Sequence, residues 1–168
     1  MKGLTLFEIL VAVLIVAFII GGMFGVLNVS TTNYDINLAS LNLQRQARQA
    51  MSWLSREIRQ ARLSTIMTGL DANNNNTVTF DTLDAVGIRY YVERTVVSGK
   101  TFWQLKREYP PGTVVVKAND ITTLLFPARS VGSSIQRISL EAGKTFFSGG
   151  TQRSLTFSLA EQVQVRNP

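Results

Sequence analysis

The chain has no cysteine and no histidine among its 168 residues. Without cysteine, no disulfide can stabilise the fold. Without histidine, the chain lacks the commonest general base and the commonest zinc ligand. An enzyme would have to work with Asp, Glu, Lys and Ser, and these show no recognised catalytic arrangement. We therefore expect no enzymatic activity, no cofactor, no metal site and no small-molecule substrate.

Charge is almost absent from one long stretch near the N-terminus. The run Leu4–Leu27 is apolar, and Glu8 is its only charged residue. Roughly 20 apolar residues span a bilayer, so this run is long enough for a membrane helix. A carboxylate is unfavourable in such a segment and calls for a partner or a function. Cleavage after Gly3 would supply a partner for the Glu8 carboxylate, because the new α-amine of Leu4 would lie one helical turn from Glu8.

Two simpler interpretations of this segment explain less. An ordinary signal peptide has an apolar region of roughly 7–15 residues followed by a small-residue cleavage site. Here the run is longer and ends in Asn-Val-Ser-Thr at residues 28–31. A plain membrane anchor fits the length but leaves Gly3 and Glu8 unexplained.

The stretch Gly-Leu-Thr-Leu-Phe-Glu at residues 3–8 resembles the processing site of type IV prepilins and type II secretion pseudopilins. The resemblance implies that a membrane prepilin peptidase cuts after Gly3 and methylates the amine of Leu4. It also implies that Glu8 is needed for assembly. Leu4 departs from the family pattern, which usually has phenylalanine or methionine at this position. Lys2 gives the leader a positive charge, which favours a cytoplasmic N-terminus.

A second helical pattern follows a polar neck at residues 30–37. Its apolar residues recur at steps of three and four, which places them on one stripe of a helix. This stripe, called the seam below, consists of Leu43, Ala47, Ala50, Leu54, Ile58 and Ala61. Four arginines fall on the opposite side of the helix and form a basic face, namely Arg45, Arg48, Arg56 and Arg59. Together with the net charge of +6, this basic face is compatible with an anionic partner.

The two patterns are expected to form one nearly continuous helix, because no proline occurs between Leu4 and Met67. Its length would be about 95 Å at roughly 1.5 Å per residue. Three glycines, Gly21, Gly22 and Gly25, are its flexible points, since each costs up to about 1 kcal/mol relative to alanine. A bend or local melting is expected there.

The loop Asp71–Asn76 is expected to end the helical region, because asparagine and aspartate favour turns. It lacks the glycine and the closing glutamate of a standard calcium loop, so we interpret it as a turn. Beyond it, alternation of apolar and polar residues and turn signals predict strands. The expected strands are 77–81, 86–97, 101–109, 121–126, 135–141 and part of 155–165.

The order of elements predicts an α+β fold, in which a long N-terminal helix covers one face of an antiparallel sheet with its seam. Four parts are expected along the chain. They are a leader at 1–3, a transmembrane and assembly half of the helix at 4–29, a neck and amphipathic half at 30–67, and a β-rich head at 68–168 that packs on 38–67.

Beyond the N-terminus, four stretches together resemble J-type minor pseudopilins and W-type minor pilins: 48–61, 88–92, 105–107 and 163–167. The resemblance implies a pilin-like structural subunit near a filament tip, with other pilin-like subunits, the prepilin peptidase and an inner-membrane assembly platform as partners. It implies one pass through the bacterial inner membrane, with a cytoplasmic N-terminus and a periplasmic head. Secretion pseudopilus, type IV pilus and competence fibre all stay open.

The alternative is a DNA-binding, competence-type minor pilin that uses the basic face. Arginines of this kind bind phosphates, but no aromatic residues interleave with them for base stacking. A solvated polar face explains the same arginines. We therefore expect protein partners before nucleic acid.

Overall fold

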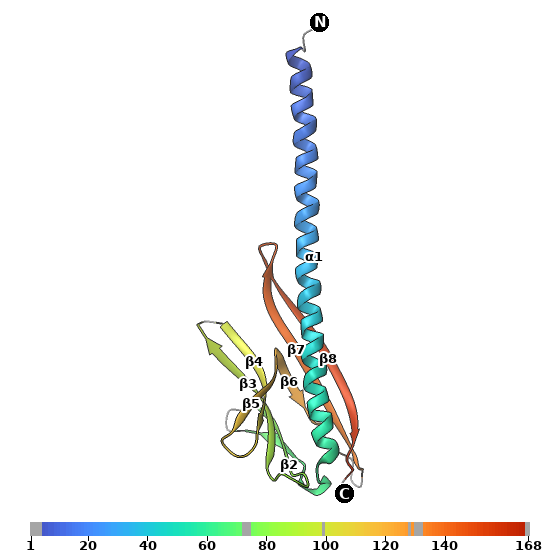
Figure 1. Ribbon diagram of the computed structural model, residues 1–168, viewed down its shortest axis with the longest axis vertical. Helices are drawn as coiled ribbons and strands as arrows, with labels where there is room; N and C mark the ends of the chain where they lie inside the picture. Colours follow the sequence, from blue (N-terminus) through green and yellow to red (C-terminus); the bar gives the residue numbers. More distant parts are fainter. Residues whose placement is uncertain (1–4, 72–74, 99, 128, 130–132, 167–168) are drawn as a thin grey trace. The chain divides into compact units, whose positions relative to one another are not determined.

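The structure is a computed structural model that describes residues 5–71, 75–98, 100–127, 129 and 133–166. It confirms the α+β class: one long N-terminal helix is followed by antiparallel strands (Figure 1). The helical elements are α1 (Leu6–Gln60) and the 3-10 helix η1 (Leu63–Thr65). The strands are β1 (Met67–Leu70), β2 (Asn76–Phe80), β3 (Ile88–Val97), β4 (Lys100–Glu108), β5 (Val114–Asn119), β6 (Ile121–Leu125), β7 (Ile135–Ser148) and β8 (Thr151–Gln164).

The chain divides into two compact units. The first combines the chain up to Leu38 with the segment Phe146–Arg153, and the second contains Ala39–Thr145 and the residues from Ser154 onward.

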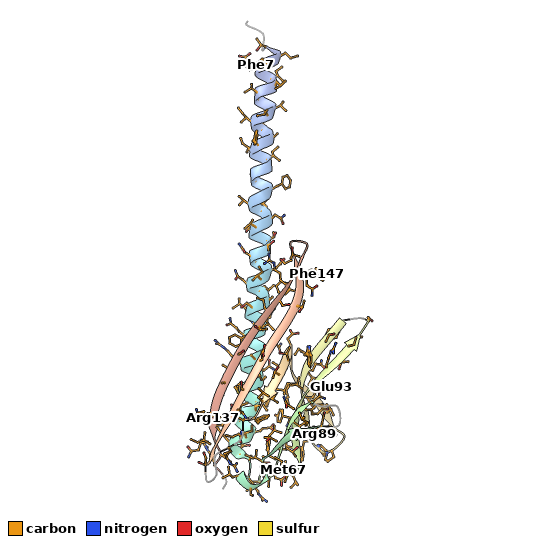
Figure 2. All side chains as sticks on the ribbon, turned by 180° about the vertical axis from the view of Figure 1, so that it is seen from behind. Phe7, Met67, Arg89, Glu93, Arg137 and Phe147 are labelled. Carbon is orange, nitrogen blue, oxygen red and sulfur yellow. The ribbon has the colours of Figure 1, made fainter. Side chains whose placement is uncertain are left out.

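The first unit contains the apolar part of α1, whose side chains project outward around the helix (Figure 2). By length and composition, α1 is the one helix in the described part of the chain that could cross a membrane. The helix continues without interruption through Gly21, Gly22 and Gly25, and a bend or local melting at these glycines stays a prediction. It also continues through the polar neck at residues 30–37, as expected for one continuous helix.

A tight turn between β7 and β8 contacts α1 within this first unit. The Ser148 hydroxyl donates a hydrogen bond to the Asp35 carboxylate at 3.2 Å. Gly149 has a φ of +59° and lies so close to the helix that a Cβ atom there would be 2.9 Å from Oγ1 of Thr32. Gly149 therefore meets two requirements, a left-handed backbone and a close approach, that a residue with a side chain does not meet without strain.

The second unit holds the core, and the structure buries all six seam residues in it. The strands form two antiparallel sheets and not the single sheet expected from the sequence. The larger has the order β1-β2-β3-β4-β5, and the smaller has the order β6-β7-β8. At the centre of the larger sheet, the rings of Phe80 and Tyr90 stack with centroids 6.3 Å apart.

The helix ends at Gln60, earlier than the predicted Met67. Just beyond it, the N–H of Arg62 donates to the carbonyl of Asp81 at 2.7 Å, so a backbone donor that would extend the helix is used by another segment. Met67 then opens β1, which pairs with β2. The Asp71–Asn76 loop consequently joins two strands and does not end the helix.

Two strands were not predicted from the sequence. All four residues of β1 are exposed, and β5 begins with three consecutive half-exposed valines, so neither strand shows the alternation by which a strand is recognised. Several other strand boundaries differ from the expected ones. The strand expected from Val86 begins at Ile88, after Gly87 with a φ of +79°, and the strand expected to stop at Glu141 continues to Ser148.

The burial of the seam predicts how a shortened chain behaves. Removal of all residues before Asn33 should leave a folded monomer, because the seam packs on the chain's own sheets. Circular dichroism should show mixed helix and strand, and sedimentation should give the monomer mass. An unfolded product, or one that folds only as a helical oligomer, would mean that the seam needs a partner helix.

Candidate assembly site and basic groove

The first turn of α1 forms a capping box around Glu8. Oε2 of Glu8 accepts hydrogen bonds from the backbone N–H of Thr5 at 2.9 Å and from the Thr5 hydroxyl at 3.1 Å. In return, Oγ1 of Thr5 accepts the N–H of Glu8 at 3.3 Å. This reciprocal arrangement satisfies backbone donors that a helix leaves unpaired at its N-terminus. Glu8 is therefore both the charged residue of the apolar run and part of the helix cap.

Thr5 was not singled out from the sequence, although the Thr-x-x-Glu spacing of a capping box was visible there. The processing residues Gly3 and Leu4 lie outside the described residues. The expected contact between Glu8 and the Leu4 amine therefore stays a prediction. What the geometry adds is that one carboxylate oxygen, Oε2, is used by Thr5, while Oε1 accepts no hydrogen bond from any residue in the described part of the chain.

The basic face is exposed at all four predicted arginines. Three of them, Arg48, Arg56 and Arg59, line a groove of about 540 Å³ in the second unit. The other wall comes from β8 and the residues that follow it. The basic groove is lined by Arg48, Met51, Ser52, Ser55, Arg56, Arg59, Gln60, Leu159, Glu161 and Arg166. Arg45 lies outside it.

Of the described residues that line this basic groove, Glu161 is the one with a carboxylate. Its Oε1 pairs with Arg59 at 3.2 Å, and its Oε2 accepts the Ser55 hydroxyl at 2.7 Å. The N–H of Arg166 donates to the carbonyl of Arg59 at 3.0 Å, which ties the segment after β8 to the last turn of α1. The groove is thus held by contacts between two segments far apart in sequence.

A second ion pair joins α1 to the larger sheet and was not visible in the sequence. Nε of Arg107 lies 3.0 Å from both carboxylate oxygens of Glu57, and both side chains are largely buried. The hydroxyl of the neighbouring Tyr90 is buried, and it has no hydrogen-bond partner among the described residues. Burial raises the pKa of the Tyr90 phenol far above its ordinary value, and the Glu57 carboxylate raises it further, while Arg107 opposes the rise.

The remaining candidates have structural roles. Both carboxylate oxygens of Asp71 are used, since Asn75 donates to each of them and Arg89 pairs with one at 3.3 Å. These contacts fit a turn; residues 72–74 of the loop lie outside the described residues. The ammonium group of Lys117 lies 4.2 Å from the ring centroid of Trp53, so this tryptophan helps to hold β5 on α1.

Comparison with protein-family models, with curated proteins and with solved structures found no significant match.

Proposed function

We propose that this chain is a minor, pilin-like structural subunit of a type II secretion pseudopilus or a type IV pilus, assembled near the filament tip. The observation that carries the proposal is the place of Glu8. It lies in the first turn of a helix whose following apolar side chains are exposed, and that same helix continues into the buried seam. A charge at the end of such a segment suits a helix that joins a bundle of like helices.

The exposed apolar surface of α1 is unfavourable in water and is expected to be buried against lipid or protein. Large side chains from Leu6 to Val29 are exposed around the helix, far more than a soluble monomer leaves in contact with water. In the proposed function, the lipid of the bacterial inner membrane covers them first, and the helices of other pilin-like subunits cover them after assembly. The chain would cross the membrane once, with its head in the periplasm, before an assembly platform moves it into the filament.

The processing step is tested by Gly3→Leu. If only glycine fits the prepilin peptidase beside the cut, this variant should stay uncut and anchored. Intact-mass measurement of membrane-extracted protein should show Met1–Gly3 missing from the wild type and retained in the variant. Gly22→Leu is the matched control, since a Cβ atom at Gly22 would contact nothing in the structure, and it should be cut normally. A wild-type protein that keeps its leader beside an active peptidase would overturn the proposal.

A further inference from the structure

The basic groove has more positive charge than its own carboxylate can balance. Among the lining residues that the structure describes, four are arginines, namely Arg48, Arg56, Arg59 and Arg166, and one is a carboxylate, Glu161. Glu161 is already fully used by Arg59 and Ser55. Within the described part of the chain, no carboxylate forms an ion pair with the other three arginines.

The three arginines without an ion-pair partner all line the same groove. Arg48, Ser52, Arg56 and Arg59 follow one another at helical spacing, so they share one face of α1, and Arg166 faces the groove from beyond β8. Like charges placed together repel one another, and this repulsion persists until an anion binds between them. The groove is therefore electrostatically prepared for a negatively charged ligand.

The rest of the lining favours a polypeptide over a nucleic acid. Among the described residues that line the groove none is aromatic, so they offer no surface for base stacking. Met51 and Leu159 add apolar contact between the arginines, which suits peptide side chains. β8 is also the last strand of its sheet in the described structure, so one of its edges has no β-partner. An extended peptide can pair with such an edge.

We infer that the basic groove binds an acidic, extended polypeptide segment of a partner protein. Carboxylates of the segment pair with Arg48, Arg56 and Arg166, and its backbone pairs with the open edge of β8. Arg59 keeps its contact with Glu161 and maintains the shape of the groove. This inference does not depend on the filament proposal, so a failed Gly3 processing test would leave it intact.

The test uses the full chain in an uncharged detergent and a fluorescein-labelled peptide of alternating glutamate and valine. Fluorescence anisotropy at about 50 mM NaCl should detect binding that weakens as salt is added. The double variant Arg48→Gln/Arg56→Gln should lose about tenfold in affinity, since two charge-assisted contacts are removed. Unchanged affinity, or no binding at low salt, would overturn the inference.

The matched control is Arg45→Gln/Arg137→Gln, which removes the same number of charges from exposed positions outside the groove (Arg137 is labelled in Figure 2). It should change the affinity less than twofold, on the order expected for general screening. An equal loss in both double variants would mean that net charge alone attracts the peptide, and the groove would then have no specific role.

Two further ligands separate the alternatives. A peptide methylated on alternate backbone nitrogens should bind about tenfold more weakly, because it loses main-chain hydrogen bonds to β8. Unchanged binding would contradict strand pairing. A thymidine oligonucleotide should bind more weakly than the peptide. If it binds more tightly and depends on Arg48 and Arg56 in the same way, the groove recognises phosphates and the polypeptide assignment is wrong.

Discussion

Replacing Glu57 with alanine should lower the free energy of unfolding by about 3 kcal/mol, because it leaves the charge of Arg107 buried without its partner. The two side chains are only 16% and 17% exposed, and Nε of Arg107 contacts both carboxylate oxygens. The guanidinium group is also 5.4 Å from the ring centroid of Tyr109, so it is enclosed from the strand side. Urea unfolding of the chain that begins at Asn33 measures the loss.

Two controls separate the buried charge from general damage to the core. Lys144→Ala removes a more exposed pair, Lys144 with Asp120 at 3.5 Å, and should cost less than about 1 kcal/mol. The double variant Glu57→Leu/Arg107→Leu should recover most of the stability, since it removes both charges and fills the space with apolar groups. If Glu57→Ala costs no more than Lys144→Ala, the pair is effectively solvated and the burial argument fails.

The helix and its seam could be predicted because their signals are local. Apolar residues at steps of three and four depend only on the neighbouring turns of the same helix, and residues from Leu43 to Ala61 follow that spacing over five turns of sequence. The division into two sheets could not be predicted, because it depends on which strands pair across the chain. Likewise, β1 and β5 are edge strands of their sheet, where exposed positions need not alternate.

In the candidate sites too, local features could be predicted from the sequence, and contacts between distant segments could not. Glu8 was visible in the sequence, since a charge in an apolar run stands out, and Thr5 could have been found from the spacing of the capping box. Arg48 and Arg56 were visible as a helix face. The sequence did not show that Glu161 and Arg166 line the same groove. These two residues are more than 100 positions further along the chain and reach the helix only in the folded unit. The pair of Glu57 and Arg107 was also missed, because these residues are 50 positions apart and meet only in the folded unit.

If the chain is the proposed filament subunit, Glu8→Leu should leave cleavage and membrane insertion intact and should abolish or strongly impair incorporation into filaments. In a bundle of such helices, the carboxylate can pair with the α-amine of a neighbouring subunit's Leu4, which neutralises two charges in an apolar environment and sets the axial register. The loss should appear as reduced secretion or piliation at matched protein levels, and as weaker recovery of other pilin-like subunits in pulldowns. Intact mass confirms that processing still occurs.

Glu8→Leu removes the helix cap and the charge together, so a second variant is needed to separate these two effects. Glu8→Gln keeps a side-chain oxygen that can accept the Thr5 N–H, as glutamine does at this position of a capping box, but it removes the charge. If the proposed pairing with an α-amine sets assembly, Glu8→Gln should fail about as severely as Glu8→Leu. Thr5→Val, which removes the hydroxyl contacts and keeps the carboxylate, should assemble better than either. Normal assembly of Glu8→Gln would show that the cap is sufficient and that the charge-pairing argument is wrong for this chain.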